Sequence, residues 1–169
     1  PYGYTDTQIS TFHAFGDRVI REHALELGLP SEPRVLSRPE TVIFLSERLF
    51  RLDLDEYRPL GNPTRFLAAL ATLFSRLKDE DVSPAAYAAH AARLAAEADS
   101  STADDPAREA RLETARRQAE LAGAYARYQE LLGEAGAIDF GDQVALALRL
   151  LREHPAARAE LQARFRYVL

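Results

Sequence analysis

The stretch Ile9-Ser10-Thr11-Phe12-His13-Ala14-Phe15 joins a short β-prone run to the start of a helix. The helix is predicted from Phe12, because the apolar residues that follow recur at roughly helical spacing until Gly28 and Pro30. A hydroxyl, an imidazole and two aromatic rings therefore gather at one junction. Such a set could hold a phosphate and stack a base. Composition alone favours the alternative, in which both rings belong to the hydrophobic core.

The bulk properties of the chain limit the classes of function. Its 169 residues suffice for one domain with a hydrophobic core, and 47% hydrophobic with 28% charged residues is ordinary for a globular protein. No apolar run reaches the roughly 20 residues that span a bilayer, so we expect no membrane partner and a cytoplasmic location. The absence of cysteine excludes disulfides and thiolate metal sites. A net charge of −5 means that any DNA contact must be local.

Helix start signals recur along the middle of the chain. Ser37-Arg38-Pro39-Glu40 is a capping-box pattern, and a capping side chain precedes proline at Asn62-Pro63, Ser83-Pro84 and Asp105-Pro106. The long helix from Pro106 to about Glu134 ends before Gly136, and Asp139 can cap another. The residues predicted to face inward are Val42, Ile43, Leu45, Leu49 and Phe50; Phe66, Leu67, Leu70, Leu73, Phe74 and Leu77; Leu112, Ala115, Ala119, Ala122, Tyr125 and Leu132; and Val144, Leu148 and Leu151.

Short strands are predicted near both ends of the chain, at 7–11 and 165–169. Two lone strands cannot form an independent sheet, so we expect them to belong to a larger parallel sheet outside this chain. The predicted fold class is therefore mainly α, with a helical subdomain over 12–164 between strand segments 1–11 and 165–169. The chain begins at Pro1 and contains no methionine, which also suggests a fragment of a longer protein.

The sequence offers little chemistry for a self-contained enzyme. It has no phosphate-binding GxxxxGK[ST] or GxGxxG motif, its histidines lack metal-ligand spacing, and no serine lies in a nucleophile elbow. Asp139 and Asp142 lie three residues apart at a predicted helix start, where a cap and a first-turn acid account for both. We therefore expect no catalytic, cofactor-binding or metal-ligating residue in this chain.

Three stretches, in this order, resemble motifs of the UvrD/PcrA/Rep-like superfamily 1 DNA helicases. Ile9 to Phe15 is similar to that family's "TFHSF" motif, and Ile138-Asp139-Phe140-Gly141-Asp142-Gln143 is similar to its "LDFDDL" segment. Arg164 to Leu169 is similar to the strand that leads into the family's Walker B motif. Ala14 replaces the commoner serine and removes one phosphate donor. Gly141 and Gln143 replace aspartate and leucine, which we expect to loosen the helix start.

The resemblance implies a piece of the first RecA-like motor domain with its inserted helical subdomain. The complete protein would use ATP and Mg²⁺ to translocate on and unwind DNA, whereas this fragment, without Walker A and B motifs, would be inactive. Single-stranded and forked DNA and the remaining helicase domains would be its partners. Thr11 and His13 would contact backbone phosphate, Phe12 or Phe15 would lie beside the strand, and Lys78, at the end of an amphipathic helix, is included among the DNA-contacting residues. Asp139 and Asp142 would have a bracing role.

Two alternatives remain open from the sequence. The acidic balance and the amphipathic helices also fit a stand-alone all-α protein-interaction module without a DNA role. A helicase–nuclease of the RecB/AddA type would share the same motifs, because those motifs lie in the motor domain that both kinds of protein contain.

Overall fold

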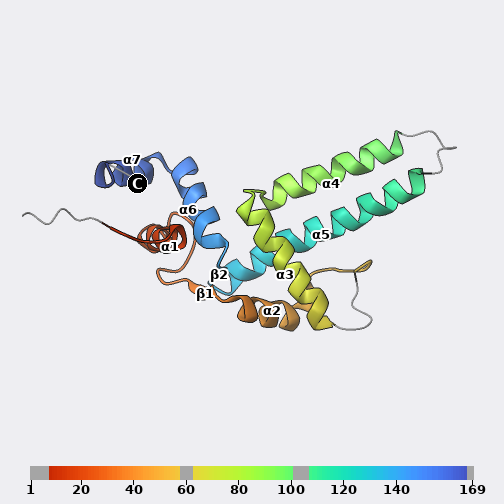
Figure 1. Ribbon diagram of the computed structural model, residues 1–169, viewed down its shortest axis with the longest axis horizontal. Helices are drawn as coiled ribbons and strands as arrows, with labels where there is room; N and C mark the ends of the chain where they lie inside the picture. Colours follow the sequence, from red (N-terminus) through yellow and green to blue (C-terminus); the bar gives the residue numbers. More distant parts are fainter. Residues whose placement is uncertain (1–7, 58–62, 101–106, 167–169) are drawn as a thin grey trace, which may run out of the picture.

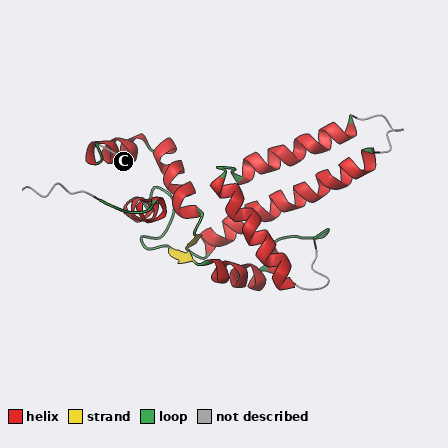
Figure 2. Ribbon diagram, in the orientation of Figure 1, coloured by secondary structure: helices red, strands yellow, loops and turns green. Residues whose placement is uncertain are grey.

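The computed structural model describes residues 8–57, 63–100 and 107–166. Within these ranges the chain is elongated and mainly helical, and it contains one pair of short strands (Figures 1 and 2). This confirms the predicted fold class. The elements are α1 (Phe12–Glu22), β1 (Arg34–Leu36), α2 (Arg38–Glu47), the 3₁₀ turn η1 (Leu49–Arg51), α3 (Pro63–Asp79), α4 (Pro84–Asp99), α5 (Arg108–Glu134), β2 (Ala137–Asp139), α6 (Asp142–Glu153) and α7 (Pro155–Arg164).

The two described strands lie inside the chain and pair with each other. β1 and β2 run parallel, with Val35 opposite Ile138, and all three residues of β2 are buried. The described residues of the predicted end strands, 8–11 and 165–166, form no strand. A strand needs a neighbour for its N–H and C=O groups, and β1 and β2 supply one for each other. The assignment of the chain ends to a larger sheet, and the boundaries at 11 and 164, stay predictions.

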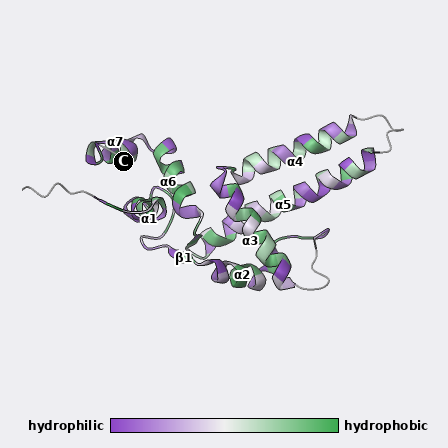
Figure 3. Cartoon of the chain, in the orientation of Figure 1, coloured by the Kyte–Doolittle hydropathy of each residue, from purple (hydrophilic) through white to green (hydrophobic). Residues whose placement is uncertain are grey.

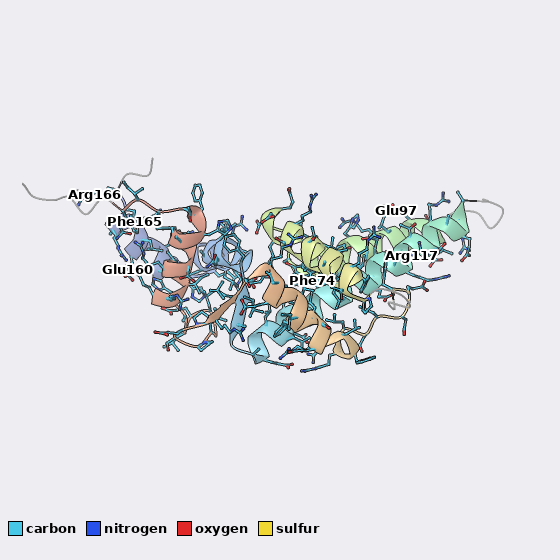
Figure 4. The ribbon with its side chains drawn as sticks, turned by 60° about the horizontal axis from the view of Figure 1, so that its bottom comes forward. Phe74, Glu97, Arg117, Glu160, Phe165 and Arg166 are labelled. Atoms are coloured by element: carbon cyan, nitrogen blue, oxygen red, sulfur yellow. The ribbon has the colours of Figure 1, made fainter. Side chains whose placement is uncertain are left out.

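The helices from α2 to α5 form one unit, which we call the arm. α4 and α5 lie side by side as an antiparallel pair, and α3 crosses α5 near the middle of the molecule (Figure 1). Aromatic rings fill the arm's core: the Phe74 ring stacks on Tyr125 and Tyr128, with centroids 5.2 and 5.0 Å apart. Phe44 meets Tyr128 edge to face at 6.2 Å. In Figure 4 Phe74 lies among the helices of the arm, far from its outer end.

The helices α1, α6 and α7 form a second unit, which we call the base. Its core contains Val19 and Ile20 of α1, Leu150 of α6, Leu161 of α7 and Ile138 of β2, so the parallel strands join the base to the arm. Hydrophilic and hydrophobic residues are interspersed along the helices of both units (Figure 3). Among the helices that the structure describes, none has the length and apolarity needed to cross a membrane.

The predicted helix signals are confirmed where the structure describes them. The capping box is present: the Ser37 backbone N–H and hydroxyl donate to Glu40 Oε2 at 2.9 and 2.6 Å. Ser83 caps α4 by accepting the backbone N–H of residue 86 at 3.1 Å. Gly136 has φ +59°, the left-handed conformation expected after a helix. Asn62, Asp105 and Pro106 lie outside the described residues.

Several predicted details are wrong. α1 ends at Glu22 rather than near Gly28, because turns follow it and lead the chain toward β1. The faces of α2, α5 and α6 that pack against other elements also differ from the predicted inward faces. The residues predicted to be buried that are exposed are Ile43 (57%), Phe50 (94%), Ala119 and Val144 (40%). In their place Thr41 and Phe44 of α2 and Gln143, Ala147 and Leu150 of α6 face inward.

Candidate nucleic-acid interface

Thr11 stands at the exposed N-terminal end of α1. Its backbone is extended (φ −71°, ψ 161°), and its Oγ1 accepts the backbone N–H of Ala14 at 3.2 Å. Acceptance of that bond leaves the hydroxyl hydrogen free to donate. The first N–H groups of a helix and its dipole also favour an anion at this end. Thr11 therefore lies where a phosphate could be held from two sides.

His13 brings the two sequence motifs into contact. Its ring stacks on Phe140, with centroids 4.1 Å apart and planes inclined by 19°. His13 is half-buried, whereas Phe140, in the turn between β2 and α6, is 57% exposed. The sequence analysis gave Phe140 no role of its own in binding. The only signal in the sequence is a large aromatic residue directly after a buried strand, and its partner is visible only in three dimensions.

The two phenylalanines of the opening motif have different surroundings. Phe12 is 81% exposed, so its ring is available to a partner. Phe15 is half-buried, and its ring meets Phe165 edge to face at 5.3 Å, which ties α1 to the chain after α7 (Phe165 is labelled in Figure 4). Phe12 is therefore the ring of the motif that could lie beside a bound strand, while Phe15 packs within the base.

Lys78 does not belong to this exposed edge. Its side chain is 2% exposed, and its Nζ lies 2.6 Å from Asp139 Oδ2 and 2.8 Å from Asp142 Oδ1. The same amine lies 5.1 Å from the centre of the Tyr128 ring. An amine enclosed by two carboxylates and a ring cannot reach a phosphate in this arrangement. The sequence analysis placed Lys78 among the DNA-contacting residues, and the structure corrects this assignment to a buried ion cluster.

The carboxylates of this ion cluster also bond each other's backbone. Asp139 Oδ1 accepts the Asp142 N–H at 3.0 Å, and Asp142 Oδ2 accepts the Asp139 N–H at 2.9 Å. The Tyr128 hydroxyl donates to Asp139 Oδ2 at 2.8 Å. Burial raises the pKa of Asp142, although the positive charge of Lys78 opposes the rise. Burial and the nearby Asp139 raise the pKa of Tyr128, which keeps its hydroxyl a donor. The cluster therefore joins α3, α5, β2 and α6.

Gly141 and Gln143 are the two residues that differ from the similar helicase segment. They do not loosen the start of α6, contrary to the expectation from the sequence. A Cβ at Gly141 would lie 3.1 Å from Lys78 Cδ and 3.4 Å from Asp139 Oδ1, so this glycine lets the lysine pass close to the backbone. Gln143 is buried, and its Nε2 donates to Asp17 Oδ1 of α1 at 3.3 Å. Glycine and glutamine at these positions thus fasten the start of α6 to the arm on one side and to α1 on the other.

The comparison with protein families identifies one family for this chain. The family described as the UvrD/REP helicase N-terminal domain matches residues 3–169. The chain belongs to this family. The comparison with curated proteins gave no match. The resemblance stated from three short motifs is therefore confirmed over nearly the whole chain.

Charges around the exposed edge of this helicase domain are few and largely paired. The Arg18 guanidinium contacts the Gln8 side chain, and Arg21 Nε lies 2.8 Å from Asp17 Oδ2. In the ranges that the structure describes, no group of three or more histidine, aspartate or glutamate side chains could hold a metal ion. The chemistry that these residues support is therefore contact with a polymer through rings, a hydroxyl and helix N–H groups.

Proposed function

We propose that this chain is the part of an ATP-dependent DNA helicase that contacts single-stranded DNA at the N-terminal end of α1. The observation that carries the proposal is the stack of His13 on Phe140 at an exposed edge, where two helicase motifs distant in sequence meet. A structural pair of rings would be expected to lie inside a core. Here the outer ring remains more than half exposed.

Each group at this edge suits one part of a DNA strand. Phe12 and Phe140 present exposed rings on which bases can stack, and such stacking contributes about 1–3 kcal/mol per base. Thr11 and the first N–H groups of α1 suit a phosphate between the bases. His13 supports Phe140 from beneath and can donate from a ring nitrogen. This arrangement reads no base edges, so we expect binding with little sequence preference.

The acidic balance of the chain limits the electrostatic part of the contact. With a net charge of −5, the protein gains little from bulk attraction to DNA, so few phosphates are neutralised. For single strands the slope of log K against log salt is about −0.7 per neutralised phosphate. We therefore expect a shallow salt dependence from this domain, corresponding to one or two phosphates, with the remaining affinity supplied by other domains of the helicase.

The arm is proposed to lie near duplex DNA ahead of the single strand. It projects away from the base, and its outer part carries charged residues on both helices, among them Glu97 and Arg117 (Figure 4). Arg117 pairs with Glu113, and Arg116 Nη2 lies 3.6 Å from Glu109 Oε1, so a phosphate would have to compete with these acids. ATP and Mg²⁺ are proposed for the complete helicase, and no step of ATP chemistry is assigned to residues of this chain.

The decisive experiment measures single-stranded DNA binding by the complete protein that contains this domain. Fluorescence anisotropy with a labelled oligonucleotide, at several salt concentrations, would compare the parent protein with Phe140→Ala and His13→Ala. We expect each variant to raise the dissociation constant about tenfold, which corresponds to about 1.4 kcal/mol for one lost stacking contact. His90→Ala is the matched control, because His90 is an exposed histidine on α4, away from this edge.

The outcome separates the proposal from the alternatives. Unchanged affinity in both variants, with both proteins folded by circular dichroism, would contradict the proposed contact. If the complete protein also lacked any DNA binding at low salt, the stand-alone interaction module would become the better explanation. A nuclease activity in the complete protein would support the helicase–nuclease alternative without changing the role proposed for the α1 edge.

A further inference from the structure

α1 and α6 approach each other closely at Gly16. This residue is buried, and a Cβ built on it would lie 2.1 Å from the carbonyl oxygen of Gln143 and 2.9 Å from its carbonyl carbon. The obstacle is backbone, which cannot turn away as a flexible side chain could. Any side chain at position 16 would therefore have to push α1 away from the first turn of α6.

The backbone conformation gives no reason for glycine here. Gly16 lies inside α1 and is absent from the positive-φ residues of the described chain, which include Gly28 and Gly136. Glycine inside a helix is also less favourable than alanine, because it gains no helix propensity and has more freedom to lose. The close approach to Gln143 is thus the structural reason for this glycine.

Gly16 lies next to the stacked rings in the helix interface. Residues three apart share a helix face, so His13 and Gly16 point toward the same neighbour. The opposing segment offers Phe140 to His13 and the Gln143 carbonyl to Gly16, and Asp17 bonds Gln143 Nε2 beside them. The separation of the two helices at Gly16 therefore decides whether the His13 ring reaches Phe140.

We propose that Gly16 is a positioning residue for DNA contact: its missing side chain holds α1 against α6 and keeps His13 stacked on Phe140. The DNA part of this inference rests on the proposed function, while the positioning part is independent of it. Gly16 touches no strand itself. Its effect on binding acts through the ring pair.

The chain offers a matched control for the test. Gly123 lies inside helix α5, as Gly16 lies inside α1, but a Cβ there would meet nothing within 4 Å. Gly123→Ala and Gly16→Ala make the same chemical change and bring the same gain in helix propensity. Only Gly16→Ala introduces an atom into a packed interface, so a difference between the two variants reports packing alone.

The first measurement follows the ring pair without DNA. In the complete protein, phenylalanine 140 is replaced by 4-fluorophenylalanine, and its ¹⁹F resonance is recorded for the parent, His13→Ala, Gly16→Ala and Gly123→Ala. His13→Ala calibrates the shift caused by loss of the stack. We expect Gly16→Ala to move the resonance in the same direction and Gly123→Ala to leave it in place. An unmoved resonance in folded Gly16→Ala would overturn the positioning role.

The second measurement follows DNA-stimulated ATP hydrolysis in the same proteins without the fluorine label. Gly16→Ala should raise the single-stranded DNA concentration for half-maximal stimulation by about tenfold, the size of one lost stacking contact, and leave the maximal rate within about twofold. A lower maximal rate with an unchanged half-saturating concentration would contradict positioning through DNA contact. A shifted fluorine resonance with unchanged DNA response would retain the positioning role and contradict the proposed function.

A second variant keeps the test decisive if Gly16→Ala does not fold. Ala147 Cβ lies 3.6 Å from the position of a Cβ on Gly16, so Ala147→Val adds its two methyl groups from the α6 side of the same contact. We expect it to move the fluorine resonance in the same direction as His13→Ala. No movement in folded Ala147→Val would overturn the proposal.

Discussion

The arm and the base use opposite means of packing helices together. In the arm, the large rings of Phe74, Tyr125 and Tyr128 fill the space between helices. In the base, α1 rests on α6 through Gly16, where no side chain separates the two backbones. These rings are almost completely buried, so they give the arm its hydrophobic core. The close approach in the base brings two chain-distant segments to one exposed edge, which is the geometry that a binding site requires.

The buried ion cluster connects the arm to the base. Lys78 comes from the arm, and its carboxylate partners Asp139 and Asp142 belong to the strand and helix that enter the base. Phe140 stands between those two acids in the chain. A change on the arm side can thus reach the exposed ring through a single turn of backbone, because both Lys78 and Tyr128 contact Asp139 directly.

The largest expected effect tests the arm. Phe74→Ala removes a fully buried ring between two tyrosines and should lower the free energy of unfolding by about 4 kcal/mol, through lost burial and a cavity. Guanidinium denaturation followed by circular dichroism measures this loss. Hydrogen exchange should show that α4 and α5 lose more protection than α1 and α6. Equal loss in both units would show that arm and base fold as one cooperative block.

The next effect tests the link between the units. Lys78→Met leaves two buried carboxylates without their cation and should lower the free energy of unfolding by about 3 kcal/mol near neutral pH. Arg76→Met, an exposed cation on the same helix, is the control and should change stability by less than about 0.5 kcal/mol.

The loss in Lys78→Met should also depend on pH. Burial already raises the pKa of Asp142, and removal of the opposing positive charge raises it further. For an acid with a raised folded-state pKa, the contribution to stability is complete below the unfolded-state pKa and is lost as pH rises through the folded-state pKa. The deficit of Lys78→Met should therefore shrink from pH 8 to pH 5, measured by denaturation at each pH. A deficit that does not vary with pH would contradict the role of unpaired carboxylates.

The smallest effect tests the junction of β1 and α2. The Ser37 hydroxyl and N–H and the Arg34 guanidinium lower the pKa of Glu40 from 4.5 to about 2. A lowered folded-state pKa contributes stability above pH 4.5 and loses it as pH falls toward 2. The melting temperature of Glu40→Gln should therefore lie below that of the parent at pH 7 and converge with it at low pH. Glu160→Gln on α7, labelled in Figure 4, is an exposed control that should follow the parent.

Local signals in the sequence predicted most of the helices. The capping box at Ser37, the cap at Ser83 and the left-handed Gly136 each depend on a few neighbouring residues, and each is present. The amphipathic spacing of α3 also held, because its apolar stripe is wide enough to define a face. The pattern of α2 is weaker, and Ile43 turns outward there. In α6 the spacing is strongly amphipathic, but the inward face is rotated, so Val144 is exposed and Ala147 and Leu150 are buried.

The candidate site likewise has a part that the sequence predicted and a part that only the structure shows. The residues from Thr11 to Phe15 and the segment around Asp139 are recognisable as motifs of a helicase family. Each motif is defined by the types of a few neighbouring residues and their order, and both can be read from the sequence. Their contact is a tertiary event. Only the folded structure shows His13 on Phe140, Lys78 enclosed between two aspartates, and Gly16 against a backbone carbonyl. Capping and periodicity act over a few residues, whereas each of these contacts joins segments more than fifty residues apart, and such distances leave no periodic trace in the sequence.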